Sequence, residues 1–122
     1  MSDPGVIDEA EFGRLLETVG GDREFLAELI ETYLVDAPPL LADIRGSAAA
    51  SNFDVLRRAA HTLKGTSASF GLVRLVDSCR VLEAAGAESS ADGLDASVDA
   101  ASSAYAEAET ALRARLAATA PA

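Results

Sequence analysis

Residues 57–71, RRAAHTLKGTSASFG, contain the only histidine of the chain, His61, between two arginines and a lysine. A neutral imidazole is a nucleophile near neutral pH, because its unperturbed pKa is about 6.5. Lys64 follows by one helical turn, and an ammonium group there stabilises a dianionic group carried on the imidazole. This positive charge stands in a chain of net charge −10. We therefore interpret His61 as the centre of the chemistry.

The helical periodicity around His61 predicts which way the ring points. Each residue of a helix turns by about 100°, and with His61 at zero five residues lie within about 40° of the opposite pole. We predict that these five form the buried stripe: Leu56, Ala59, Leu63, Thr66 and Phe70. A buried histidine is the alternative, and this arrangement disfavours it. Five others lie within about 60° of His61 on the exposed side: Arg57, Arg58, Lys64, Gly65 and Ala68.

Gly65 is an unusual residue for the middle of a helix, where glycine costs about 0.5–1 kcal/mol relative to alanine. The functional interpretation is that another protein approaches the backbone closely beside His61. The alternatives are a local weakness of the helix or tight packing against a neighbouring element. Arg57 and Arg58 also have an ordinary interpretation, as solvated surface charges. Together on one face, these residues favour a partner-binding surface.

The composition indicates a single helical domain over residues 1–122, with about 8–117 structured and the ends frayed. Hydrophobic residues make up 49% and aromatic residues 5%, with abundant alanine and leucine, which favours helix. We expect a cytoplasmic protein, since no signal peptide or membrane-spanning run is recognised. The net charge of −10 disfavours nucleic acid and anionic membranes as partners.

Five helical segments are predicted, over about 8–19, 22–44, 51–71, 72–86 and 94–116. Asp8 is expected to form a capping pair with Glu11, and the third segment is expected to start at Ser51 or Asn52, with Asp54 placed to pair with Ser51. Gly86 is expected to stop the fourth segment. In the second, the residues predicted to face the core are Phe25, Leu26, Leu29, Ile30, Tyr33 and Leu34.

Pro38 and Pro39 interrupt the second segment, but Leu40, Leu41 and Ile44 resume its pattern. We predict one long helix bent at the prolines. The expected fold is all-α: an antiparallel up-down-up-down four-helix bundle, with the short N-terminal helix across one end.

The run AAHTLKGTSASFG fits the pattern A-H-x-L-K-G-[small]-[small]-x-x-[apolar]-G and resembles the histidine-containing phosphotransfer (HPt) domains of multistep phosphorelays. FLAELIETYLVDAPPLLADI is similar to the family's second helix. LVRLVDSCRVLEAAG is similar to the helix after the histidine, with Leu82-Glu83 where the family often has Leu-Glu. The resemblance spans about residues 10–86. Thr66 and Phe70 depart from the more usual residues without affecting the site.

The resemblance implies a four-helix bundle whose exposed histidine accepts a phosphoryl group from an aspartyl phosphate of a receiver domain and passes it to another receiver. Carried over to this chain, His61 is the phosphoacceptor, Lys64 the counter-charge of the phosphoryl group, and Gly65 the gap that admits the receiver. Arg57, Arg58 and Ala68 complete the expected partner-binding surface.

The implied partners are response-regulator receiver domains and a hybrid sensor histidine kinase, bound by a monomer. No cofactor is expected in this chain, and Mg²⁺ is expected only in the receiver. The sequence holds no Walker loop or glycine-rich phosphate cradle, so we expect no ATP-dependent kinase activity.

Three other interpretations remain open on the residues alone. The dimerisation and phosphoacceptor domain of a sensor kinase typically has an acidic residue after the histidine, where this chain has Thr62. An acyl carrier protein would carry its prosthetic group on Ser78, but that serine lies inside a predicted helix. A purely scaffolding bundle is the third.

A metal site or hydrolase is disfavoured, because one histidine gives no ligand cluster. Asp77 and Glu83 are interpreted as parts of solvated helix faces, and Cys79 as a core residue.

Overall fold

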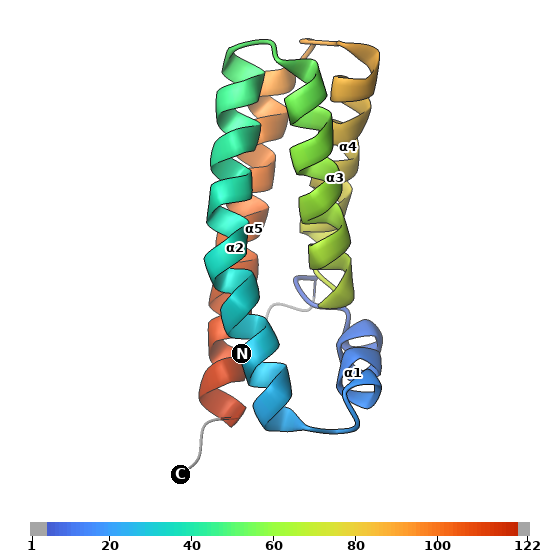
Figure 1. Cartoon of the computed structure of the whole chain (residues 1–122), viewed down its shortest axis with the longest axis vertical. Helices are drawn as coiled ribbons and strands as arrows, with labels where there is room; N and C mark the ends of the chain where they lie inside the picture. Colours follow the sequence, from blue (N-terminus) through green and yellow to red (C-terminus); the bar gives the residue numbers. More distant parts are fainter. Residues whose placement is uncertain (1–4, 120–122) are drawn as a thin grey trace.

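A computed structural model of the chain describes residues 5–119, which fold into five helices (Figure 1). Their bounds are α1 Glu9–Thr18, α2 Arg23–Ala49, α3 Phe53–Ser69, α4 Val73–Glu88 and α5 Leu94–Thr119. The described part of the chain has no strand, so the predicted all-α class is confirmed. The predicted fraying at residues 1–4 and 120–122 lies outside the described residues. The structured part is longer than the predicted 8–117, because Val6 and Ile7 are buried and α5 continues to Thr119.

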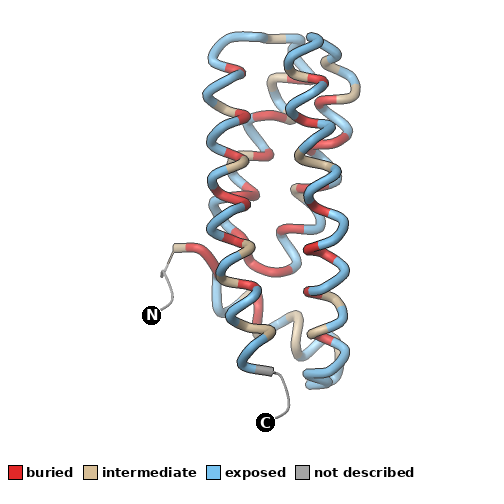
Figure 2. The backbone as a smooth tube through the Cα atoms, turned by 90° about the vertical axis from the view of Figure 1, so that its left-hand side faces the viewer, coloured by how far each residue is buried: buried red, intermediate tan, exposed pale blue. Residues whose placement is uncertain are grey.

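The four long helices, α2 to α5, run alternately up and down and form the predicted antiparallel bundle (Figure 1). α2 and α4 each pack against both α3 and α5, which closes a ring of four neighbours. α1 lies at one end of the bundle, where it contacts α2 and α3. Buried positions recur along all the long helices, so the core extends along the bundle (Figure 2).

The core consists mainly of aliphatic side chains that recur every three or four residues along each helix. The largest that are fully buried are Leu26, Ile30, Ile44, Leu56, Leu63, Leu72, Leu75, Leu82 and Leu112. Burying each one stabilises the fold by about 1.5–3 kcal/mol. One polar contact crosses this core, between the Tyr33 hydroxyl on α2 and the Ser67 hydroxyl on α3, 2.7 Å apart. Ser67 is therefore buried without leaving its hydroxyl unpaired.

The predicted helix caps are confirmed only in part. The Asp8 carboxylate caps α1 by accepting hydrogen bonds from the backbone N–H groups of Ala10 and Glu11. The expected return bond from the Glu11 side chain is wrong, because that carboxylate pairs with Arg14 at 2.6 Å. The backbone N–H of Asp8 instead donates to the Gly71 carbonyl at 2.7 Å, which ties α1 to the turn between α3 and α4.

The start of α3 agrees with one of the two expected residues, Asn52, but not with the expected capping pair. Asn52 is its N-cap, and its side-chain oxygen accepts from the backbone N–H of Val55 at 3.3 Å. Ser51 precedes the cap with a φ of 54°, and Asp54 pairs with arginines of the next turn. The predicted Ser51–Asp54 capping pair is therefore wrong.

α2 stays helical through Pro38 and Pro39, which confirms one long helix rather than two. Phe25 is 45% exposed although the periodicity places it toward the core. It lies in the first turn of α2, at the end of the bundle, where fewer helices cover it.

α4 does not stop at Gly86 but continues to Glu88, and Ser89 ends it with a φ of 50°. Gly86 is buried in the contact with α3. A Cβ built there would lie 2.8 Å from the Arg57 backbone nitrogen and from the Phe53 carbonyl oxygen. The glycine therefore permits close helix packing rather than helix termination.

Candidate functional site

His61 lies in the middle of α3 with 66% of its side chain exposed, as the wheel predicts. Four of the five residues predicted on the opposite stripe are buried: Leu56, Ala59, Leu63 and Phe70. The prediction is wrong for Thr66, which is exposed, whereas Ala60 and Ser67 are buried. α3 packs against both α2 and α4, so its buried face is wider and turned toward those two residues.

Glu83 of α4 brings the site together, and its predicted place on a solvated helix face is wrong. One carboxylate oxygen, Oε2, lies 2.7 Å from His61 Nδ1, and the other, Oε1, accepts from Lys64 Nζ at 2.5 Å. Its side chain is only 24% exposed, in the contact between α3 and α4. The Leu82-Glu83 pair was part of the resemblance, but the sequence does not reveal that this carboxylate meets the imidazole.

The carboxylate decides which nitrogen of the ring carries the proton. Hydrogen bonds from Lys64, and secondarily from His61, lower the pKa of Glu83, so its carboxylate is ionised and only accepts. We therefore assign the proton of the neutral ring to Nδ1, which donates to Oε2. The other nitrogen, Nε2, keeps its lone pair and is the nucleophilic atom.

Lys64 is linked to His61 through this shared carboxylate. Its ammonium is 27% exposed and rests on the oxygen of Glu83 that the imidazole does not use. The residue one turn after the histidine is therefore held beside the site by a charge-assisted hydrogen bond. The ammonium and the imidazole therefore share one carboxylate.

Gly65 is exposed, and no heavy atom beyond its own helix backbone and chain neighbours lies within 4 Å of where its Cβ would be. Tight packing against another described element, one of the alternatives, is therefore excluded. Gly13 and Gly46 have equally open surroundings, so openness alone does not identify a binding surface. What distinguishes Gly65 is its position on the same side of α3 as His61, next to exposed Ala68.

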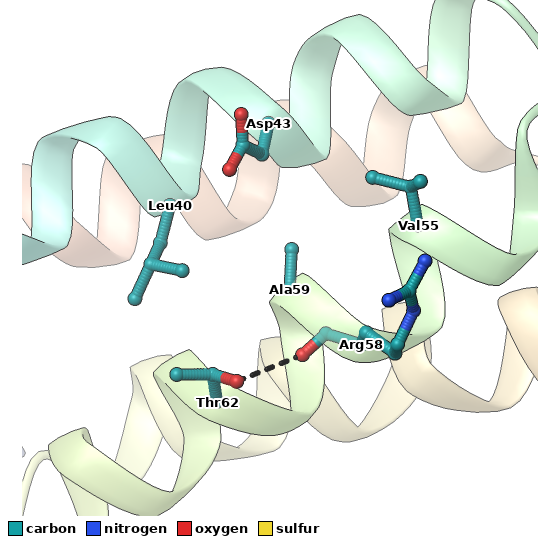
Figure 3. A pocket seen from close by; sticks show the side chains of 6 residues that line it. All are labelled: Leu40, Asp43, Val55, Arg58, Ala59 and Thr62. Carbon is teal, nitrogen blue, oxygen red and sulfur yellow. Dashed lines mark hydrogen bonds between the residues drawn. The ribbon is translucent and has the colours of Figure 1, made fainter.

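The two arginines before the histidine point to different sides of α3. Both pair with Asp54, Arg57 at 3.2 Å and Arg58 at 3.0 Å. The Cβ of Arg57 lies against Gly86 of α4. Arg58 instead borders a shallow groove between α2 and α3 (Figure 3). The groove is lined by Leu40, Asp43, Val55, Arg58, Ala59 and Thr62.

Other candidate chemistry finds little support in residues 5–119. They contain no group of three or more His, Cys, Asp or Glu side chains arranged to hold a metal ion. Cys79 is fully buried, as predicted, and burial raises the pKa of its thiol to about 12, which keeps it protonated. Ser78 lies within α4 rather than at a helix start, unlike the attachment serine of an acyl carrier protein. No helix in this part of the chain is long and apolar enough to cross a bilayer.

Fold and site together define a class: a four-helix bundle that presents an exposed histidine with an ionised carboxylate behind the ring. The family model described as "Hpt domain" matches residues 28–120. The chain therefore belongs to the Hpt domain family. The match includes α5, whereas the sequence resemblance ended near residue 86.

Similar proteins agree with this assignment. Multistep phosphorelay regulator 1 of Schizosaccharomyces pombe is 30% identical over 95 residues, which cover 77% of this chain and 32% of that protein. The chain thus spans about a third of the length of this curated relative.

Two crystal structures share the fold. Histidine-containing phosphotransfer protein B (HptB) from Pseudomonas aeruginosa PAO1 has a TM-score of 0.85 at 22% identity, covering 95% of this chain and 97% of that one. The histidine-containing phosphotransfer protein ZmHP2 from maize has a TM-score of 0.77 at 24% identity, covering 93% and 84%.

Proposed function

We propose that His61 Nε2 is the phosphoacceptor atom of this Hpt domain, taking a phosphoryl group from the aspartyl phosphate of one receiver domain and giving it to the aspartate of another. The observation that carries the proposal is the 2.7 Å contact between His61 Nδ1 and Glu83 on an otherwise exposed ring. It leaves Nε2 unprotonated and accessible. Phosphoryl transfer mainly needs such positioning together with charge neutralisation.

In the accepting step, the Nε2 lone pair forms a bond to phosphorus while the bond from phosphorus to the aspartyl oxygen breaks. The receiver's carboxylate leaves with that electron pair. Lys64 supplies positive charge beside the transferred group. The chain needs no cofactor of its own in this scheme, because the Mg²⁺ that neutralises the transferred group is supplied by the receiver.

The receiver docks on the His61 side of α3, where exposed Gly65 and Ala68 let its backbone come close to the helix. Arg58 borders the groove toward α2, and Arg57 lies on the α4 side. Positive side chains at both edges would orient an acidic receiver pocket over the ring. Proposed partners are response-regulator receivers and the receiver of a hybrid sensor histidine kinase, met in the cytoplasm by a monomeric domain.

The test is transfer of ³²P from receiver domains phosphorylated with labelled acetyl phosphate. The wild-type domain should gain acid-labile, alkali-stable label, as expected for phosphohistidine, and ATP alone should give none. His61→Gln should gain none while unfolding at the same temperature as wild type, because the ring is mostly exposed. Label that persists on His61→Gln would refute the site. If no receiver of a broad panel labels the wild-type domain, the bundle acts as a scaffold and the proposed function is wrong.

A further inference from the structure

We infer that Glu83 also governs the release of the phosphoryl group: it retains the proton on Nδ1 after Nε2 is phosphorylated, so that His61 departs as neutral imidazole when the second aspartate attacks. This inference rests on the proposed function, since it concerns the second half of the same transfer. Glu83 touches neither the phosphorus nor the receiver in this scheme, so it is a positioning residue.

In this geometry Glu83 can only accept a hydrogen bond from Nδ1 of the ring. Its Oε2 lies 2.7 Å from Nδ1, and its Oε1 is occupied by Lys64 Nζ at 2.5 Å. An ionised carboxylate has no hydrogen to donate, so it pairs only with a ring that carries a proton on Nδ1. Loss of that proton would leave the Nδ1 lone pair facing the carboxylate, which is repulsive. Lys64 reinforces this preference, because its ammonium keeps Glu83 ionised.

The balance of the release step shows why the proton matters. An oxygen of the receiver's aspartate forms a bond to phosphorus, the bond from Nε2 to phosphorus breaks, and its electron pair returns to Nε2. With the proton on Nδ1, the phosphorylated ring is a cation and leaves as neutral imidazole. Without that proton, the leaving group is imidazolate, a much stronger base and a poorer leaving group. The carboxylate therefore favours onward transfer by keeping the ring cationic.

The other charged and titratable groups around the ring do not take over this role, since a nearby cation opposes a proton on the ring. From α3, Lys64 pairs with Glu83, and Arg57 and Arg58 both pair with Asp54. From α2, Asp43 lies across the groove that Arg58 borders. From α4, the Cys79 thiol is buried and uncharged, as its pKa of about 12 requires. Glu83 is the acidic group within hydrogen-bond distance of Nδ1.

Glu83→Gln is the direct test, because the amide keeps the shape of the side chain but can both accept and donate. Its oxygen still pairs with a protonated Nδ1, whereas its NH₂ group pairs with a deprotonated one. The matched control is Glu88→Gln, the same change at an exposed position of the same helix. Circular dichroism melts establish that both variants are folded before either is used.

The first measurement needs no receiver. Each protein is phosphorylated with phosphoramidate, and the ³¹P resonance of phosphohistidine is followed from pH 5 to pH 10. We expect the midpoint in Glu83→Gln to fall by about one pH unit relative to wild type, since an opposite charge within about 4–6 Å stabilises a cation by at least that much. Glu88→Gln should follow wild type. Equal midpoints in Glu83→Gln and wild type would overturn the inference.

The second measurement is the rate of transfer from phosphorylated domain to an unphosphorylated receiver at several pH values. On the alkaline side of the Glu83→Gln midpoint, we expect that variant to release the group about tenfold more slowly than wild type, which follows from a shift of about one unit. On the acidic side the two rates should converge. A defect that is the same at every pH would indicate a merely structural role and contradict the inference. Failure of the proposed function would instead appear as wild-type protein that receivers cannot label.

Discussion

Two glycines of neighbouring helices have opposite surroundings. Gly86 of α4 faces inward, where a Cβ would come within 2.8 Å of the backbone of α3. Gly65 of α3 faces outward, where a Cβ would meet nothing within 4 Å. The sequence presents Gly65 as a costly residue inside a helix and Gly86 as the end of one. The structure assigns the first to packing inside the bundle and removes packing as a reason for the second.

The α3–α4 pair therefore has a close backbone contact at Gly86 and an accessible surface at Gly65, within a few turns of each other. Around Gly86 the backbones of α3 and α4 are close, which fixes the two helices side by side. That contact positions Glu83, one turn earlier on α4, against His61. Around Gly65 the backbone is uncovered beside the same histidine. Substitutions at the two glycines should therefore affect different properties of the protein.

Gly86→Ala should cause the largest change. The added methyl group would overlap backbone atoms of Phe53 and Arg57, which cannot move aside as a flexible side chain can. We expect the free energy of unfolding to fall by about 1–3 kcal/mol, the usual cost of overpacking. Urea denaturation measures it. Gly46→Ala is the control: it lies in open surroundings near the end of α2 and should stabilise the protein by about 0.5–1 kcal/mol. Equal stability of Gly86→Ala and wild type would show that the two helices can separate without cost.

Gly65→Gln should change binding rather than stability. Glutamine is a good helix former and meets no neighbour there, so the free energy of unfolding should stay equal or rise by up to about 1 kcal/mol. The longer side chain should hinder a receiver, and we expect about tenfold weaker docking, equivalent to about 1.4 kcal/mol. Titration calorimetry with a receiver that labels wild-type domain provides the measurement. Gly46→Gln makes the same change away from His61 and should bind normally. Normal binding by Gly65→Gln would contradict the proposed docking surface.

The smallest effect should be the loss of unfolding free energy when the pH of the solution is lowered and Glu83 is protonated. Lys64 and His61 lower the pKa of Glu83 in the folded state below its ordinary value of 4.5. The stability that this carboxylate contributes is therefore fully present above about pH 4.5 and is lost as the pH falls through the lowered pKa of the folded protein. Chemical denaturation between pH 7 and pH 3 should show wild type losing more stability than Glu83→Gln. Parallel curves for the two proteins would mean that these contacts add nothing to stability.

Apolar periodicity predicted the helices, the bundle and the outward direction of His61, because burial of apolar stripes dominates the free energy of folding. It was less successful where two helices meet. The hydroxyl pair of Tyr33 and Ser67 places a polar side chain in the core, and a wheel drawn for one helix selected Thr66 instead.

Glu83 could not be placed in the candidate site from the sequence for the same reason: its role depends on how two helices meet. Glu83 is a carboxylate among many in an acidic chain, and only the rotation of α4 against α3 brings it to Nδ1. Local sequence fixes that rotation poorly, since it depends on how closely the two backbones approach at Gly86. Likewise Arg57 and Arg58 are adjacent in the sequence but diverge, because successive helical residues point about 100° apart.

Under the proposed function, the single exposed imidazole of α3 determines how the two receivers bind in turn. Donor and recipient must occupy the same nitrogen in turn, so they exclude each other and no three-protein assembly is on the route. A donor receiver that has already given up its phosphoryl group competes for the docking surface with one that is still phosphorylated. The rate of phosphoryl transfer would then depend on how fast unphosphorylated receivers dissociate. An excess of them would slow the transfer without any dedicated inhibitor.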